Sequence, residues 1–541
     1  MIKPLQSQVT TASTIHRSSN IYLYIAVFTS GMVTLAVELS ASRLLGNVFG
    51  TSNLVWANVI GLMLLYLTVG YFIGGRWADR SPYYRTLFTI MIWGAFLSAL
   101  IPLAARPVLR AAATAVVDAE AALALGSFIS ILVLFSVPVT LLGCVSPFAI
   151  RLAIEDPKDA GRIAGQIYAI STMGSLLGTF LPTLLLIPEL GTFRTFIAFS
   201  GVLFFIALIG LWLYEGPSVA IRWLWMPVII GVLSIWALSG PLRPPEDNAT
   251  ILYDDESAYN YIQVQEDADG YRYLYLNEGL GVHSIWHATD LQYDGTWDVF
   301  LAAPYFNDPP YQMADVERVL VIGLAAGTIP RQYFHIYGNG LPIDGIEIDP
   351  GIIDAAAQYF DMNAESMPNL AVYAEDGRYI LNRLDERYSV IAIDAYRPPY
   401  IPWHLTTVEF FQEVREHLLP DGVVAINVGR TNDDRRLVDA MTRTLSAVYP
   451  TVHAIDVPRS FNTILVATMQ PTLPINLLDN LNGLDADAPQ MLRDIIQLSI
   501  NALVPAVSSD VIFTDDRAPL ETMVDSLTLN FLLNGDVEDI R

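Results

Sequence analysis

Cysteine and lysine are nearly absent from this chain of 541 residues, and charged residues of every kind make up only 16% of it. The single cysteine, Cys144, lies inside an apolar run, which excludes an intrachain disulfide and a cysteine metal cluster. Lys3 and Lys158 are the two lysines, so almost all positive charge is arginine. Apolar residues reach 53%, which excludes a disordered tail protein and a fibrous repeat.

The charge is divided unequally along the chain. Residues 1–244 hold 14 Lys and Arg against 9 Asp and Glu, a net of +5. Residues 245–541 hold 16 against 46, a net of −30, and the two parts sum to −25. We therefore expect an apolar, slightly basic half followed by a strongly acidic half. The acidic half argues against nucleic acid as a partner.

Apolar runs in the first half are long enough to cross a membrane, which takes about 20 residues for a core of roughly 30 Å. They predict an α-helical transmembrane bundle of about seven spans, multi-pass in a cell membrane, with the lipid bilayer as a partner. The runs are 21–44, 53–75, 84–105, 122–150, 165–188, 193–214 and 222–240.

Small and charged residues within these runs indicate how the helices pack. The pairs Gly70 with Gly74 and Gly174 with Gly178 have four-residue spacing, which is typical of closely packed membrane helices. Glu38 lies in the first run, five residues before Arg43. A carboxylate at that depth is either a cation or proton site or a structural pair within the bundle, and we favour the structural pair.

Basic residues in the connecting loops bear on orientation. Nine lie on the side of the N-terminus and five on the other side, which indicates a cytoplasmic N-terminus. An odd number of crossings then places the acidic half outside the cytoplasm, whereas an enzyme that uses a cytosolic cofactor should lie inside. The side of the membrane on which the acidic half lies stays open.

The second half predicts a Rossmann-like, methyltransferase-type α/β domain behind a small N-terminal antiparallel β-sheet. Residues 251–284 alternate in the manner of short antiparallel strands. Strand-like stretches at 318–322, 343–348, 370–374 and 389–393 are each followed by a loop and a helical pattern, which predicts a parallel sheet. The expected domains are a transmembrane domain at 1–244, a β subdomain at 245–310 and a nucleoside-binding domain at 311–541.

Glycines and acids follow these strands where parallel sheets bind ligands. Gly323 and Gly327 allow close backbone approach in the first turn, and Glu347 is placed to accept hydrogen bonds from ribose hydroxyls. Asp376 could accept from an adenine amino group, and Asp394 points into the same cleft. Together they predict a nucleoside site. Singly, the aspartates at 349, 376 and 394 could each instead be a helix N-cap.

At these residues the chain resembles the spermidine synthases, which are polyamine aminopropyltransferases, and more closely their membrane-fused versions. The resemblance covers about 251–430 together with a tail motif at 514–521. It implies decarboxylated S-adenosylmethionine as co-substrate, a diamine such as putrescine as acceptor, and no metal. The most specific stretches are VLVIGLAAGT at 319–328, GIEIDP at 345–350, EDGR at 375–378, DAY at 394–396 and IPWHLTTVEFF at 401–411.

The resemblance also implies residue roles. Asp394 matches the catalytic aspartate, which removes a proton from the amine and orients it. The cofactor would be bound by Gly323, Gly327, Glu347, Asp349, Asp376 and Gly377, with Glu347 on the ribose and Asp376 and Gly377 on the adenine. The diamine would be bound by Tyr259, Asp298 and Tyr396.

Four positions depart from the family pattern, mostly on the amine side of the site. Ala326 stands where soluble members have an aspartate that holds the aminopropyl ammonium, and Arg397 where they have a second acid. Tyr259-Asn260 replaces a Tyr-Gln pair, and Thr296-Trp-Asp298 replaces a Tyr-(Gln/His)-Glu stretch. We therefore keep two alternatives to an active, membrane-anchored aminopropyltransferase. One is a catalytically silent homologue that binds a nucleoside or polyamine, or is a structural subunit of a membrane assembly; the other is a methyltransferase.

Other polar groups carry weaker expectations. His283 and His287 are four residues apart, but their surroundings do not favour a metal site. The pairs Asp433-Asp434 and Asp515-Asp516 read as solvated loop acids, although the second pair belongs to the tail motif and could lie near the cleft. A homo-oligomer or a membrane-complex partner stays open.

Overall fold

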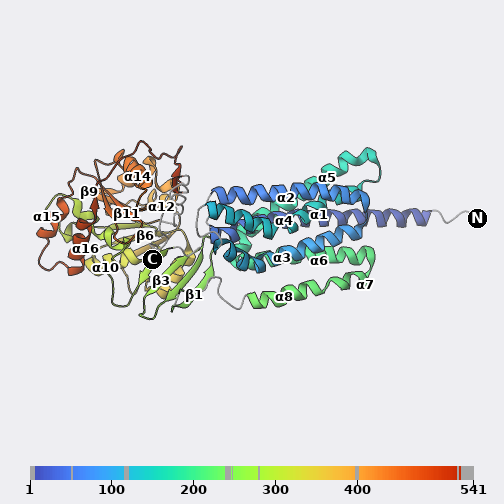
Figure 1. Cartoon of the computed structure of the whole chain (residues 1–541), viewed down its shortest axis with the longest axis horizontal. Helices are drawn as coiled ribbons and strands as arrows, with labels where there is room; N and C mark the ends of the chain where they lie inside the picture. Colours follow the sequence, from blue (N-terminus) through green and yellow to red (C-terminus); the bar gives the residue numbers. More distant parts are fainter. Residues whose placement is uncertain are drawn as a thin grey trace, which may run out of the picture. The chain divides into compact units, whose positions relative to one another are not determined.

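The computed structural model describes residues 6–49, 53–114, 121–237, 245–246, 248–277, 281–395, 401–520 and 523–524. The chain divides into two compact units, Met1–Arg243 and Pro244–Arg541 (Figure 1). Described residues of the first unit are helical throughout, and those of the second form a mixed α/β structure.

Long apolar helices that run side by side build the first unit (Figure 1). Six segments of the described chain are long and apolar enough to cross a membrane. The helices are α1 (Gln6–Phe49), α2 (Asn53–Arg80), α3 (Tyr84–Thr114), α4 (Ala121–Ala153), α5 (Ala160–Leu181), α6 (Ile187–Glu215), α7 (Pro217–Ala220) and α8 (Trp225–Ala237), with a π-helical turn at Pro182–Leu186 and 3-10 turns at Pro157–Asp159 and Ile221–Trp223.

The structure has six such segments rather than the seven that we expected. The difference lies in one segment of 59 residues, Pro157–Glu215, which joins the expected runs 165–188 and 193–214. Gly191 interrupts its helical backbone with φ 78°. A straight helix of this length would extend about 88 Å at 1.5 Å per residue, nearly three times the hydrocarbon thickness. The segment therefore has the length of two crossings.

Glycines let the helices of this unit approach closely. A Cβ atom at Gly178 of α5 would lie 2.7 Å from the carbonyl carbon of Met32 on α1. A Cβ atom at Gly74 of α2 would lie 2.6 Å from the Cα of Cys144 on α4. Since real Cβ atoms do not come this near to backbone, only glycine permits these two contacts, as expected for small-residue packing in lipid.

The second unit begins with a small antiparallel sheet in the strand order β1-β2-β3-β4. Two polar side chains of β2 are buried in this sheet. Gln263 and Gln265 have at most 1% of their surface exposed, and Nε2 of Gln265 donates to Oε1 of Gln263 at 2.8 Å. The strands are β1 (Thr250–Glu256), β2 (Tyr261–Glu266), β3 (Arg272–Leu276) and β4 (Val282–Trp286).

An eight-stranded sheet in the order β12-β10-β11-β9-β8-β5-β6-β7 forms the centre of the second unit. Strands β7, β6, β5, β8 and β9 are parallel, whereas β11, β10 and β12 join them antiparallel. The strands are β5 (Val319–Ile322), β6 (Ile343–Glu347), β7 (Leu370–Ala374), β8 (Tyr388–Ile393), β9 (Leu418–Gly429), β10 (Thr451–Asp456), β11 (Asn462–Thr468) and β12 (Leu503–Val504).

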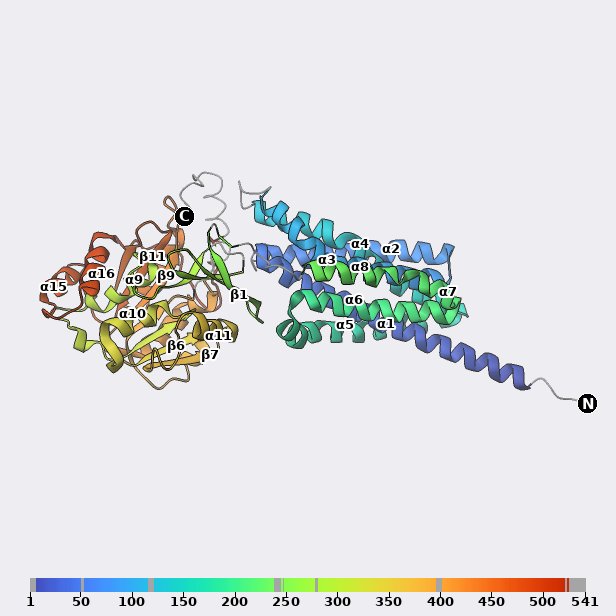
Figure 2. The ribbon, with the colours of Figure 1, turned by 90° about the horizontal axis from the view of Figure 1, so that it is seen from below.

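Helices cover both faces of this sheet, so its central strands are apolar on both sides. Val319 and Val321 of β5 belong to the core on one face, and Leu320 and Ile322 to the core on the other. Helix α11 lies beside β6 (Figure 2). One face carries α10 (Thr328–Tyr337), α11 (Pro350–Tyr359), α15 (Asn476–Gly483) and α16 (Gln490–Asn501); the other carries α12 (Gly377–Leu381), α13 (Val408–Glu416) and α14 (Arg436–Ser446). The short helix α9 (Thr296–Val299) continues into a 3-10 segment at Phe300–Phe306, with further 3-10 turns at Met313–Asp315, Gly338–Gly340 and Trp403–Leu405.

Candidate active site

The candidate site lies where the chain changes direction within the sheet. After β5 the chain adds β6 and β7 on one side, and it then returns to place β8 on the other side of β5. In open α/β sheets, the crevice at such a switch point is where ligands bind. Gly323 and Asp394, which follow β5 and β8, therefore lie on either side of this crevice.

The turn after β5 is held close to the end of β8. Gly323 has φ 86°, and a Cβ atom there would lie 2.6 Å from the carbonyl carbon of Asp394. Gly327 has φ 82° and starts α10, where a Cβ atom would lie 2.7 Å from the sulfur of Met362. Both positions thus require glycine for conformation as well as for space.

Glu347 is oriented by backbone donors. The N–H of Ala325 donates to Oε2 at 2.9 Å, and the N–H of Asp349 donates to Oε1 at 3.1 Å. Only 8% of Glu347 is exposed, and this burial raises the pKa of its carboxyl group to about 7. Because a carboxylate has about four acceptor sites, Glu347 can still accept from a ribose hydroxyl beside these backbone donors.

Asp349, two residues further on, is fully buried and has partners for both oxygens. Its Oδ1 accepts from the N–H of Gly351 at 2.9 Å as the N-cap of α11. Its Oδ2 accepts from Ser257 at 2.6 Å and from Asn260 at 2.8 Å. Asp349 therefore joins the parallel sheet to the loop between β1 and β2, and its contact with a cofactor stays a prediction.

Asp376 is both an N-cap and one half of a polar pair. Its Oδ1 accepts from the N–H of Tyr379 at 3.0 Å, and its Oδ2 lies 2.9 Å from Nε2 of His404. The hydrogen bond from His404 lowers the pKa of Asp376. Gly377 packs against β5, because a Cβ atom there would lie 2.5 Å from Cγ2 of Ile322. An adenine amino group would share Asp376 with His404.

Asp394 is the acid whose environment best suits proton transfer. Asn427, at the end of β9, donates from Nδ2 to Oδ1 of Asp394 at 2.8 Å, and the side chain of Trp297 adds a second hydrogen bond. Although Asp394 keeps some exposed surface, protein surrounds it, and burial raises its pKa to about 7. The two hydrogen bonds act in the opposite direction and favour the carboxylate.

Residues of the amine side are only partly brought to this crevice. Tyr259 is 42% exposed in the loop between β1 and β2. Asp298 has no exposed surface, and its carboxylate accepts from the N–H groups of Tyr293 and Asp294 at 3.0 and 2.8 Å and from Gln332. Tyr396 and Arg397 lie outside the described residues. The roles of Tyr259, Asp298 and Tyr396 in amine binding stay predictions.

Ala326, which by the resemblance stands at the position of an aspartate, lies in the turn between β5 and α10. It is 3% exposed, and its N–H donates to the hydroxyl of Ser284 on β4 at 2.9 Å. The hydrogen bond ties the turn to the small sheet. Carboxylates that could hold an aminopropyl ammonium must therefore come from elsewhere in the crevice.

The tail motif reaches the same edge of the sheet. Arg378 of α12 donates to Asp515 at 2.9 and 3.0 Å and to Glu413 at 2.6 and 2.8 Å. Thr407 also donates to Asp515, at 2.7 Å. Asp515 is a loop acid with 41% of its side chain exposed, as expected, and the hydrogen bond from Arg378 lowers its pKa.

Asp434 differs from the expectation of a solvated loop acid. Its carboxylate pairs with Arg436 at 2.6 Å, and only 15% of its side chain is exposed. The pair closes the turn that leads into α14, so this acid is part of the fold.

Three residues at the crevice were not selected from the sequence. Asn427 lies near the end of β9, a parallel strand next to β8, so the strand-end rule could have found it. Trp297 was noted only as a departure from the family pattern. His404 carries no local signal, because its position beside Asp376 depends on how the segment before α13 folds back.

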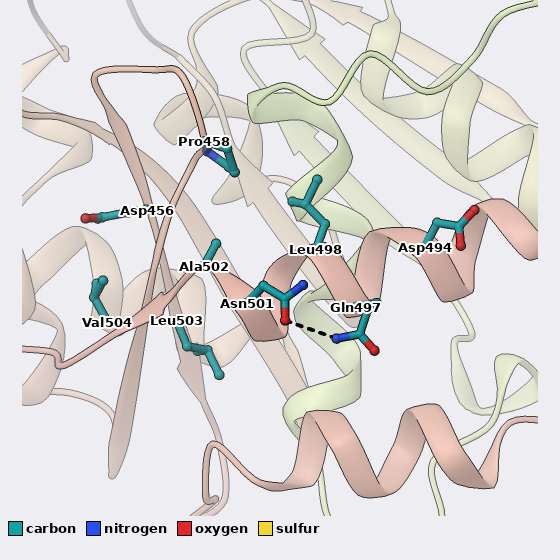
Figure 3. Close-up of a pocket in the computed structure, with 9 residues that line it drawn as sticks. All are labelled: Asp456, Pro458, Asp494, Gln497, Leu498, Asn501, Ala502, Leu503 and Val504. Atoms are coloured by element: carbon teal, nitrogen blue, oxygen red, sulfur yellow. Dashed lines mark hydrogen bonds between the residues drawn. The ribbon is translucent and has the colours of Figure 1, made fainter.

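A surface pocket of about 550 Å³ lies elsewhere in the second unit (Figure 3). It is formed mainly by the end of α16 and the strand β12. Within α16, Nε2 of Gln497 donates a hydrogen bond to Oδ1 of Asn501. The carboxylate of Asp456 points away from the other lining residues, toward partners that include Arg435 at 2.6 Å (Figure 3). None of Gly323, Glu347, Asp376 and Asp394 lines this pocket. Among the described residues no group of three or more His, Cys, Asp or Glu could hold a metal ion.

A parallel sheet with this strand order and a ligand crevice at its switch point defines a Rossmann-like domain of the methyltransferase type. Residues 306–473 match the family model of the spermine/spermidine synthase domain. The chain thus carries a spermine/spermidine synthase domain in its C-terminal half, behind the apolar helices of its N-terminal half.

Relatives of known name include polyamine aminopropyltransferases and, over 25–28% of this chain, protein methyltransferases. A probable polyamine aminopropyl transferase of Bifidobacterium longum is 30% identical over 288 residues, which are 50% of this chain and 62% of that protein. A polyamine aminopropyltransferase of Vibrio vulnificus is 28% identical over 42% of this chain and 74% of its own. A spermidine synthase in complex with the transition state analogue AdoDATO is 18% identical, with a TM-score of 0.38, over 50% of this chain and 96% of that one.

Proposed function

We propose that this protein transfers an aminopropyl group from decarboxylated S-adenosylmethionine to a diamine such as putrescine. The observation that carries the proposal is the environment of Asp394. A carboxyl group with a pKa of about 7 is held by Asn427 and Trp297 at the switch point, beside a turn that requires Gly323. The similarity to aminopropyltransferases supports the choice of substrates.

The chemistry needs alignment and one proton acceptor. Asp394 accepts a proton from the ammonium group of the diamine, directly or through water, which frees the lone pair of the nitrogen. The neutral nitrogen attacks the carbon next to the sulfonium, the C–S bond breaks, and methylthioadenosine leaves as a neutral thioether, while the new secondary amine carries the positive charge. A group with a pKa near the working pH is efficient in this role. Glu347 and Asp376 hold the nucleoside, so that the reacting atoms are kept in line.

The helical unit supports a membrane location. Six described segments have the length and composition to cross a bilayer, and large apolar side chains such as Phe72 and Leu184 are 65% and 71% exposed. Exposed apolar surface of this extent is costly in water and is stable in lipid. We infer that the first unit anchors the synthase domain to a cell membrane.

A second candidate is a homologue that binds the nucleoside without turnover. The buried Ala326 favours it, since the turn then offers no carboxylate to a positively charged aminopropyl chain. In this case the crevice would bind methylthioadenosine or a related nucleoside, and Asp394 would not accept a proton from an amine.

Turnover by the full-length chain in detergent separates the candidates. Release of methylthioadenosine from decarboxylated S-adenosylmethionine and putrescine is expected for the wild type. It should fall at least about a hundredfold in Asp394→Asn, because general base catalysis contributes about 10² to 10⁴. Binding without turnover in the wild type supports the second candidate, and the absence of binding by any S-adenosyl compound contradicts both.

A further inference from the structure

A groove of about 400 Å³ opens on the outside of the helical unit, between the end of α2, the first half of α3 and the middle of α4. Apolar and aromatic side chains form most of its wall, together with two threonines and one arginine. The lining residues are Trp77, Arg85, Thr86, Thr89, Ile90, Trp93, Leu97, Val137 and Leu141.

The polar and apolar groups of this groove lie at different depths. Arg85 is the second residue of α3, close to the end of α2 where Trp77 lies. Leu97 lies twelve residues further along α3, which is about 18 Å at 1.5 Å per residue. Half of the hydrocarbon core of a bilayer is about 15 Å thick. The groove therefore extends from one end of the bundle to about the depth of the bilayer centre, the span of a single acyl chain.

The end of the groove at Arg85, which lies at one end of the bundle, carries positive charge. Arg76, Arg80 and Arg85 are all exposed at the junction of α2 and α3. The acid at this junction, Asp79, pairs with Arg151 at 3.3 Å. Among the described residues, no hydrogen bond or ion pair holds the guanidinium of Arg85.

The neighbouring loop between α4 and α5 carries the acids Glu155, Asp156 and Asp159, against Lys158 in the loop and Arg162 at the start of α5. Asp159 pairs with Arg162 at 3.2 Å, and Asp156 accepts from the N–H of Lys158 at 2.9 Å. The junction of α2 and α3 thus keeps an excess of positive charge next to the groove.

We propose that this groove binds one anionic phospholipid, with its phosphate at Arg85 and one acyl chain along Trp93 and Leu97. An arginine at headgroup depth attracts anionic lipid, and the loop charges place this end of the bundle on the cytoplasmic side, where such lipids are found. The exposed indole of Trp77 lies at the interface, and that of Trp93 lies about 12 Å deeper, beside the acyl chain. The proposal rests on the membrane location inferred above and is independent of catalysis.

Native mass spectrometry of the full-length chain, released from bilayers of equal phosphatidylglycerol and phosphatidylcholine, tests the proposal. The wild type should retain phosphatidylglycerol several times more than phosphatidylcholine. Arg85→Gln should lower this retention about fivefold, the effect of one basic residue near an anionic headgroup. Arg162→Gln is the matched control, because Arg162 lies at the same end of the bundle outside the groove.

A second variant keeps the test valid if Arg85→Gln impairs folding. Val137→Trp places an indole in the groove at a position that is already 55% exposed, and it should lower retention without a change in unfolding temperature. Equal retention of both lipids by the wild type overturns the proposal, as does retention unchanged in both groove variants. Displacement of the lipid by soluble glycerol phosphate would show a phosphate site instead. Recovery of the chain outside the membrane fraction would contradict the membrane location itself.

Discussion

Asp394 and Asn427 form the contact on which the chemistry of the site depends most. Burial pushes the pKa of Asp394 up to about 7, and the hydrogen bond from Asn427 opposes this rise. The carboxylate is the form that accepts a proton, so kcat/KM should increase with pH through about 7. Below that pH the acid is protonated and the amine cannot be deprotonated.

Replacing Asn427 should therefore move the pH profile. In Asn427→Leu the carboxylate loses a donor, the pKa of Asp394 rises further, and the rising limb of kcat/KM against pH shifts to higher pH. Asn501→Leu, at the exposed end of α16, is the control and should leave the profile in place. A profile of Asn427→Leu that overlays the wild type would show that Asn427 does not act on Asp394.

The glycine turn offers a separate test at the residue scale. Gly323→Ala introduces a Cβ atom 2.5 Å from the Cα of Ala395 at a backbone φ of 86°. We expect a loss of about 1–3 kcal/mol in the free energy of unfolding, together with weakened nucleoside binding. Gly340→Ala meets no atom within 4 Å and should change little. Equal denaturation midpoints for the two variants would contradict the close approach of the β5 and β8 ends.

The sequence pattern predicted the positions of the strand-end acids better than it predicted their hydrogen-bond partners. Glu347, Asp376 and Asp394 could be selected because a strand pattern precedes each of them, and parallel strands end at one edge. The hydrogen bond between His404 and Asp376 could not, since it joins segments that only the tertiary fold brings together. For the same reason the sequence could not show that Ser257 and Asn260 donate to Asp349, which is also the N-cap of α11.

At the scale of elements, the contact between α1 and α5 carries a clear prediction. Gly178→Leu would force a side chain into the backbone of α1 at Met32 and separate the two helices. Gly165→Leu is the matched control on the same helix, because nothing lies within 4 Å of a Cβ atom there. We expect a lower unfolding temperature in detergent for Gly178→Leu alone. Similar unfolding temperatures for both variants would argue against close packing of α1 and α5.

The helical and parallel elements followed from sequence because their signals are local. Long apolar runs predicted the helices, and the gap between the expected runs 165–188 and 193–214 contains Gly191, where the joined segment bends. Strands β5 to β8 were predicted from repeated strand, loop and helix patterns. The antiparallel strands β10 and β11 pair with each other and with β9 beyond the last site residue, and this depends on non-local pairing that the sequence pattern does not specify.

At the scale of the whole molecule, the two units differ in charge as they do in structure. A net of +5 belongs to residues 1–244 and a net of −30 to residues 245–541. An acidic unit attracts cationic amines over distances of a Debye length, about 8 Å at physiological salt. Under the proposed function, this attraction raises the local concentration of the diamine, whereas its recognition depends on the few groups around Asp394.

Calorimetric titration of the full-length chain with methylthioadenosine tests the central claim, that the strand-end crevice binds the nucleoside. The wild type and the exposed control Glu365→Gln should bind one equivalent with the same affinity. Glu347→Gln should bind at least tenfold more weakly, about 1.4 kcal/mol, while its unfolding temperature shows that it folds. No binding by the wild type, or equal affinity in Glu347→Gln, would contradict the account.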